Sequence, residues 1–235
     1  MDRTRWIIFI VIAVVTLGGL VLLTRQEKVD VANIDPSKAV SETETAIGDQ
    51  IYGNKSSEVV LIEYGDFQCP GCEGAFPQLK TIKEEYKEQI AFIFRNFPIT
   101  TSHPNALAAS TAAEAAGLQG KFWEMHDKLY ENQNAWGTVD ASKRTAVFTG
   151  YAKDLGLDTG KFTTDLKDPR VSAKIRRDQA FGRKLGVDST PTIYLGSEKL
   201  TTEETSDLIQ SNGDLLRKKI DAALKKAGVQ AAVQE

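Results

Sequence analysis

The feature that most constrains this chain is its single pair of cysteines, placed between a strand pattern and a helix pattern. Cys69 and Cys72 are the only cysteines among 235 residues. Residues 58–64 read EVVLIEY, an apolar and β-branched run typical of a strand buried on both faces, and residues 73–89 have helical composition. A bridge that closes so short a loop removes little chain entropy, so stapling is a poor reason for the pair. The pattern favours a redox-active pair.

The position of each cysteine predicts its role. Cys69 is expected at the helix N-terminus, where unpaired N–H groups and the helix dipole favour the thiolate. Pro70 suits the first helical position. Cys72, one turn further into the helix, is expected to be shielded and to act as the resolving thiol. An inert structural bridge or half of a zinc site are the alternatives.

A long apolar run lies near the N-terminus. Residues 6–23 carry no charge, and a helix of that length spans ~27 Å against a ~30 Å hydrocarbon core. We interpret the run as a transmembrane signal anchor, with a cleaved signal peptide or a buried helix as alternatives. Arg3 and Arg5 predict a cytoplasmic tail at residues 1–5 and an outward-facing catalytic domain. Residues 24–45 are polar and predict a linker.

Residues 46–235 have the composition of one domain with a central sheet. Strands at 58–64 and 90–95 around the helix predict a right-handed βαβ unit with parallel strands. The second half predicts a strand at 192–195, an edge strand near Lys199 and a helix at 213–227. Helical patterns alone fill the interval between these halves: 105–118, 121–134, 140–155, 159–166 and 169–185. The predicted fold class is α/β, βαβ plus ββα, with a helical insertion at about 100–185.

Charge and histidine content limit the partners. A formal net charge of −3 and a pI near 5.6 argue against nucleic acid as a partner. His103 and His126 are the only histidines, and their separation does not match a metal-ligand spacing. Helix capping or packing is their expected role, and no metal or cofactor is expected apart from a Cys69–Cys72 disulfide.

Longer motifs extend the cysteine signal over most of the domain. They are EYGDFQCPGC at 63–72, RNFPIT at 95–100, HPNA at 103–106, QGKFWEMHDKLYENQ at 119–133 and GVDSTPTIYLG at 186–196. In these motifs the chain resembles DsbA-like thiol-disulfide oxidoreductases of the thioredoxin superfamily, in their membrane-anchored branch. The resemblance implies a thioredoxin fold and a bacterial membrane protein whose catalytic domain is extracytoplasmic.

The resemblance also implies roles for individual residues. Thr190 and Pro191 match the cis-proline loop, which with Pro70 and Gly71 faces a bound substrate strand. Glu63 matches a buried acid that moves a proton to or from the resolving thiol. Pro77 matches the proline that kinks the first helix.

The residues between the cysteines bear on whether the pair oxidises or reduces its substrates. Strongly oxidising members of the superfamily place a histidine before the second cysteine, where this chain has Gly71. We expect a disulfide-introducing oxidase whose partners are unfolded exported proteins with thiols and a membrane redox protein that reoxidises it. A reductase or isomerase, and a non-redox chaperone-like binding module, are the alternatives.

Overall fold

The structure is a computed structural model that describes residues 6–7, 10–14, 16, 30–210 and 212–229. The strands are β1 (Gln50–Gly53), β2 (Val60–Gly65), β3 (Ala91–Asn96), β4 (Thr192–Leu195) and β5 (Glu198–Lys199). The helices are α2 (Pro70–Glu85), α3 (Ala106–Gly117), α4 (Phe122–Glu131), α5 (Gln133–Trp136), α6 (Ala141–Asp154), α7 (Thr159–Asp165), α8 (Pro169–Lys184), α9 (Thr202–Gln210) and α10 (Asp214–Lys226).

The five strands form one mixed sheet in the order β1-β3-β2-β4-β5. β2 and β3 are parallel, as the predicted βαβ unit requires, and they are joined through α2. β1, β4 and β5 each run antiparallel to the neighbour they pair with. The βαβ plus ββα arrangement of the thioredoxin fold is therefore confirmed.

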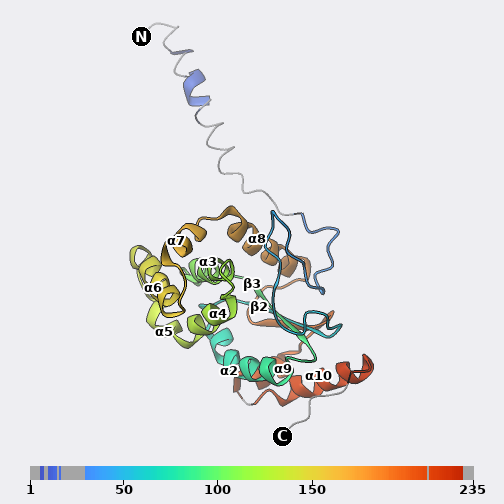
Figure 1. Cartoon of the computed structure of the whole chain (residues 1–235). Coiled ribbons are helices and arrows are strands. Elements are labelled where there is room, and N and C mark those ends of the chain that lie inside the picture. The colour runs from blue at the N-terminus through green and yellow to red at the C-terminus, as the bar shows by residue number, and fades with distance from the viewer. Residues whose placement is uncertain (1–5, 8–9, 15, 17–29, 211, 230–235) are drawn as a thin grey trace.

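Alternating side chains of the strands give the sheet two buried faces. Leu61 packs in one apolar cluster with residues of α2, α9 and α10, and Ile62 packs in another with Phe181 of α8. Accordingly, α2, α9 and α10 lie together on one side of the sheet, while α8 lies on the other (Figure 1). Burial on both faces explains why the β2 and β3 sequences are continuous apolar runs.

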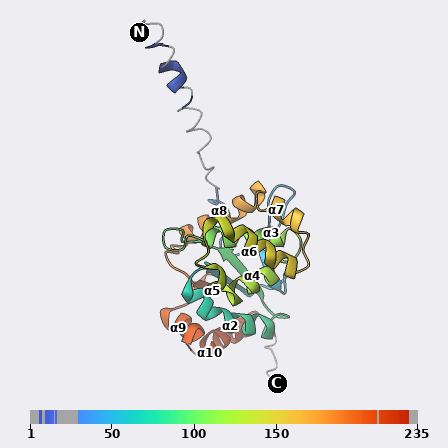
Figure 2. The same ribbon diagram turned by 90° about the vertical axis from the view of Figure 1, so that its left-hand side faces the viewer.

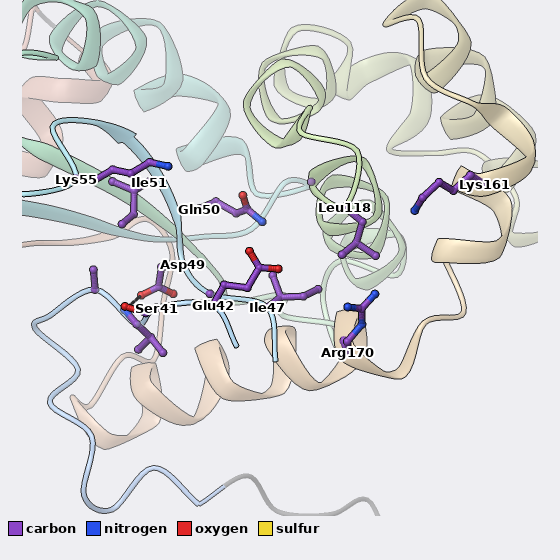
Figure 3. Close-up of a pocket in the computed structure, with 14 residues that line it drawn as sticks. Ser41, Glu42, Ile47, Asp49, Gln50, Ile51, Lys55, Leu118, Lys161 and Arg170 are labelled. Atoms are coloured by element: carbon purple, nitrogen blue, oxygen red, sulfur yellow. Dashed lines mark hydrogen bonds between the residues drawn. The ribbon is translucent and has the colours of Figure 1, made fainter. Parts of the chain in front are cut away.

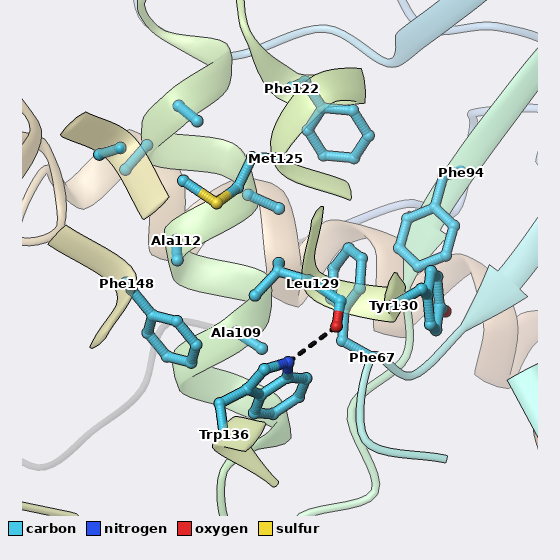
Figure 4. Packing of buried hydrophobic residues seen from close by; sticks show 14 of the residues in the cluster. Phe67, Phe94, Ala109, Ala112, Phe122, Met125, Leu129, Tyr130, Trp136 and Phe148 are labelled. Atoms are coloured by element: carbon cyan, nitrogen blue, oxygen red, sulfur yellow. Dashed lines mark hydrogen bonds between the residues drawn. The ribbon is translucent and has the colours of Figure 1, made fainter. Parts of the chain in front are cut away.

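Of the predicted insertion at about 100–185, helices α3 to α7 are gathered on the side of the molecule away from α9 and α10 (Figure 2), whereas α8, which the prediction also included, covers a face of the sheet. The alanines of α3, among them Ala109 and Ala112, let α4 approach closely, so that Met125 and Leu129 pack against them (Figure 4). Phe67 of the β2–α2 loop belongs to the same cluster. The insertion therefore shares its core with the loop that leads to Cys69.

The structure differs from the sequence prediction in three places. β1 and α9 were not predicted, because the first is only four residues long and the second is polar around the single buried residue Leu208. The predicted helix at 121–134 is divided into α4 and α5 around Asn132. The other predicted helices and strands are present, with ends that differ by a few residues.

The predicted linker at residues 24–45 needs a correction over its described part, residues 30–45. This segment lies against the domain, because cationic side chains bind its carbonyl oxygens. Arg95 Nη2 donates to Lys38 O at 2.7 Å, and its Nη1 donates to Pro36 O. Lys184 Nζ lies 2.9 Å from Ala32 O. The cations come from β3 and α8, which are distant in sequence, so these contacts could not be predicted from the polar segment itself.

The predicted transmembrane anchor at residues 6–23 lies largely outside the described residues. Among those that are described, no helix is both long and apolar enough to span a lipid bilayer. The predicted tail at residues 1–5 also lies outside them.

A buried cluster of charged side chains around Asp49 allows a test of what holds residues 30–49 against the domain. Fully buried Arg95 pairs with Asp49 at 2.8 Å. Replacing Arg95 by Met leaves that carboxylate and the bound carbonyls without this partner, so we expect the free energy of unfolding to fall by about 3 kcal/mol. Urea denaturation at pH 7 measures the loss. The control Arg183→Met, at an exposed position of α8, should change it by less than about 0.5 kcal/mol; equal effects of the two changes would contradict the assignment.

Candidate active site

The two cysteines lie at the start of α2, directly after the loop that follows β2. Cys69 is the N-cap residue of α2, with an extended backbone (φ −74°, ψ 125°), and Pro70 occupies the first turn. Cys69 is 8% exposed and Cys72 is fully buried, and both are free thiols in this structure. The expected arrangement, with one accessible and one shielded sulfur, is present.

The loop before β4 faces the cysteines. The Thr190-Pro191 peptide bond is cis, as the resemblance implied. The Cys69 thiol donates to the Thr190 carbonyl oxygen at 3.2 Å. A Cβ atom on Gly71 would lie only 3.2 Å from Pro191 Cδ, so the absence of a side chain at Gly71 allows this close approach. The predicted substrate-contacting residues Pro70, Gly71, Thr190 and Pro191 are thus brought together around Cys69.

Glu63 lies beneath the pair in β2, and it is 2% exposed. Burial, the largest influence, raises the pKa of its carboxyl to about 8; the Lys83 cation opposes this, and Cys69 adds to it. The expectation that Glu63 is buried is confirmed. A carboxyl with this pKa is largely protonated at neutral pH and can both give and accept a proton there.

Lys83 links this region to Asp127 and His126, two neighbouring residues of α4. Its ammonium lies 3.0 Å from Asp127 Oδ1, which also lies 2.9 Å from His126 Nδ1. Burial, the largest influence, lowers the pKa of His126 to about 4. His126 packs among aromatic rings, including Phe94 at 4.8 Å between centroids. This is the packing role expected from the sequence.

Asp66 fixes the loop between β2 and Cys69. Its buried carboxylate accepts hydrogen bonds from the backbone N–H groups of Gln68 and Ile99, both at 2.8 Å. His103 Nδ1 lies 2.8 Å from the same carboxylate. His103 is therefore a partner of the active-site loop.

Side-chain amides tie the loop to the insertion. Gln68 donates to Gly137 O at 2.7 Å and accepts from the Asn105 N–H at 2.7 Å. Gln133 of α5 donates to Phe67 O at 2.8 Å and to Cys69 O at 3.1 Å. The loop that presents Cys69 is thus held from α5 and from the start of α3.

A cavity of about 610 Å³ lies elsewhere, between the N-terminal segment and the insertion, and no cysteine lines it (Figure 3). Lys161 and Arg170 border it, but Lys161 is paired with Asp165 at 2.6 Å and Arg170 with Asp168 at 2.7 Å. The third lining cation, Lys55, makes no ion pair among the described residues. With two of its three cations paired and no thiol in its lining, the cavity shows less recognisable chemistry than the cysteine pair.

Comparison with known families agrees with this geometry. The family described as "Thioredoxin" matches residues 45–212, well over half of the chain. The chain belongs to the thioredoxin family. Its fold is similar to that of the solved structures described next.

Relatives of this thioredoxin-family chain include solved structures and longer proteins. BdbD from Bacillus subtilis has a TM-score of 0.64 at 21% identity and covers 80% of this chain and 99% of its own. The thiol-disulfide exchange protein α-DsbA2 from Wolbachia pipientis has a TM-score of 0.62 at 24% identity, covering 74% and 87%. The Na(+)/H(+) antiporter NhaA 1 of Salinispora arenicola is 36% identical over 151 residues, which are 64% of this chain and 22% of the antiporter. The chain spans under a quarter of the curated relatives it matches.

Within this thioredoxin-family site the pKa values of the two thiols are shifted in opposite directions. The pKa of Cys69 is lowered to about 5, chiefly because the Cys72 thiol can donate a hydrogen bond to the Cys69 sulfur. Burial opposes this effect, while the Thr190 side chain and the N–H groups of Gly71 and Cys72 lower the pKa further. The Thr190 hydroxyl is buried and has no hydrogen-bond partner among the described residues. Burial raises the pKa of Cys72 well above its usual range. Cys69 is therefore the thiolate at neutral pH.

Sequence reasoning missed several residues of this site. Asp66, Gln68 and Gln133 bind backbone groups across the fold, and nothing in their local sequence marks them. Lys83 does carry a signal, because it follows Cys72 by eleven positions and shares the buried face of α2. A lysine in an apolar helical stripe implies a buried partner.

The buried Glu63 carboxyl gives a testable dependence on pH. Its folded-state pKa of about 8 exceeds the ordinary 4.5, so the unfolded chain releases this proton first and stability falls as pH rises from about 4.5 to 8. Glu63→Gln removes this loss, so we expect the free energy of unfolding of the variant to exceed that of the natural protein by about 4 kcal/mol at pH 8. Near pH 4.5 the two should match.

Urea denaturation of the reduced proteins at both pH values measures this difference. Glu58→Gln, at an exposed position just before the same strand, is the control and should show no such change. An equal difference between Glu63→Gln and the natural protein at both pH values would contradict the assignment.

Proposed function

We propose that this protein is an extracytoplasmic thiol-disulfide oxidoreductase that introduces disulfides into exported proteins by exchange at Cys69 and Cys72. The observation that carries the proposal is the acidic thiol of Cys69 at the N-terminus of α2, beside a buried Cys72. A dithiol whose reduced form is stabilised as a thiolate tends to give its disulfide away.

The exchange proceeds in two displacements. A substrate thiolate attacks Cys69 Sγ of the oxidised pair, the Cys69–Cys72 bond breaks, and Cys72 departs with the electron pair. The protonated Glu63 carboxyl supplies the proton that Cys72 requires because of its high pKa. A second substrate thiolate then attacks the substrate sulfur of the mixed disulfide and expels Cys69, which is stable as a thiolate at neutral pH.

Each turnover oxidises two substrate thiols and leaves the Cys69–Cys72 pair reduced. An electron acceptor must therefore reoxidise the pair, and we propose a membrane redox protein for this step. The substrates would be unfolded exported proteins with free thiols. The bacterial membrane location rests on the uncharged run at residues 6–23, which is long enough for a single-pass anchor.

Gly71 supports the second candidate, a reductase or isomerase. Without a cationic side chain between the cysteines, the thiolate depends on Thr190, Cys72 and backbone N–H groups alone. A chaperone-like binding module without redox activity is the third candidate, supported by the size of the insertion that surrounds the loop.

The reduction potential of the cysteine pair separates an oxidase from a reductase. We expect the full-length protein, equilibrated with glutathione buffers and analysed by thiol trapping, to have a potential closer to ~−120 mV than to ~−270 mV, because the thiolate stabilises the reduced form. A value at the lower end would show that the pair donates electrons and would reverse the proposed direction.

Single cysteine variants separate redox chemistry from binding. Cys69→Ser removes the attacked sulfur, so we expect at least about a 100-fold loss in the rate at which a reduced model protein gains disulfides. Cys72→Ser keeps Cys69 but cannot form the Cys69–Cys72 disulfide, so it should lose the oxidising activity as well. Its Cys69 thiolate should still attack a disulfide-containing model protein and form a mixed disulfide, visible on non-reducing gels, that no Cys72 thiol can release. Full activity of Cys69→Ser would favour the binding module.

A further inference from the structure

Gln133 reaches the backbone of Cys69 from outside the active-site segment. Its side-chain amide nitrogen carries two hydrogens and donates to two carbonyl oxygens, Phe67 O at 2.8 Å and Cys69 O at 3.1 Å. Gln133 is 7% exposed and belongs to α5, more than sixty residues further along the chain. Both acceptors would be buried carbonyls with fewer partners if this amide were absent.

The Cys69 carbonyl has a particular place in α2. It accepts the Glu73 N–H at 3.1 Å, which is the first hydrogen bond of the helix. N-cap residues are usually Ser, Thr, Asp or Asn, whose side chains accept a hydrogen bond from the first turn and so fix the cap. The Cys69 side chain makes no capping hydrogen bond of this kind, although the nearby N–H groups of Gly71 and Cys72 lower the pKa of its thiol. Backbone contacts of Cys69 with other segments therefore help to hold the cap conformation.

This conformation determines where the sulfur lies. The N–H groups of Gly71 and Cys72 contribute to the low pKa of the Cys69 thiol, and they act only while the extended backbone of Cys69 directs its sulfur over the helix N-terminus. Asp66 O holds the Cys69 N–H at 3.0 Å from within the loop. Gln133 holds the carbonyl on the other side of the same residue.

The surrounding contacts keep Gln133 itself in place. Trp136, at the end of the same short helix, is fully buried and donates from its indole to Leu129 O at 2.7 Å (Figure 4). Asn105 donates to Val139 O at 2.8 Å, and Gln68 to Gly137 O at 2.7 Å, so the segment after α5 is fixed to the start of α3 and to the loop.

We infer that Gln133 is a positioning residue through which the helical insertion fixes the Cys69 backbone and so holds the Cys69 sulfur at the first-turn N–H groups of α2. The inference rests on the proposed thiol exchange at Cys69. It gives the insertion a part in the chemistry, in addition to any part in substrate binding.

The test measures the pH dependence of Cys69 alkylation by iodoacetamide in the reduced full-length protein. Cys72 is buried and remains a thiol below neutral pH, so the rate there reports Cys69 alone. Gln133→Met keeps the length of the side chain without either donor, and Gln133→Asn keeps an amide that is too short to reach both carbonyls. For each we expect the pKa to rise by about one, so the rate should fall about twofold at pH 6 and about tenfold at pH 4, which lies below both pKa values.

A matched control is available at Gln119, which also hydrogen-bonds backbone groups, at Asp158, but in a part of the insertion that makes no contact with the loop. Gln119→Met should leave the alkylation profile unchanged. Near-ultraviolet circular dichroism identifies which variants keep the native packing, and Gln133→Asn provides the comparison if Gln133→Met does not fold.

The outcomes separate this inference from the proposed function. A folded Gln133 variant with the natural pH profile overturns the inference and leaves thiol exchange intact. An ordinary thiol profile in the natural protein, with no acidic Cys69, overturns both. A profile that moves upward in the Gln133 variants and not in Gln119→Met supports the positioning role.

Discussion

The structure depends most on how one sulfur is held at one helix end. Cys69 must lie at the N-terminus of α2 with an extended backbone, facing Thr190 and the N–H groups of the first turn. β2 fixes the point at which the chain enters the helix, and the sheet brings the Thr190 loop alongside, because β4 pairs with β2. The insertion then supplies Gln133. Three segments distant in sequence thus converge on a single residue.

A second constraint acts on the opposite face of the sheet, where cations are buried with their partners. Lys174 of α8 lies 2.6 Å from Asp178 and 3.5 Å from Asp49, and Arg95 binds both Asp49 and the backbone of the N-terminal segment. Breaking such a pair is costly because the remaining charge stays buried. Residues 30–49 therefore form part of the domain, which leaves residues 24–29 as the stretch between the described domain and the predicted anchor.

Most of the fold could be predicted because its elements have strong local patterns. The continuous apolar runs of β2 and β3 and the helix after Cys69 define the βαβ unit without any long-range information. β1 and α9 could not be predicted in this way, since each buries little and gains its structure from pairing or packing. The cysteines were readable from their spacing. Gln133 was not, because its contacts join residues more than sixty positions apart.

The pKa values of Cys69, Cys72 and Glu63 differ because the three side chains are buried to different extents. Cys69 is the most exposed of the three, and hydrogen-bond donors lower its pKa. Cys72 and Glu63 are more deeply buried, and burial keeps them neutral. In the proposed exchange, neutral Glu63 can give its proton to the Cys72 thiolate as it departs, so the negative charge moves from the sulfur to the carboxylate and the total charge of the core is unchanged. Lys83, paired outward with Asp127, opposes the effect of burial on Glu63 and keeps its pKa within reach of neutral pH. The buried lysine thus links the acidity of the core to a carboxylate near the surface.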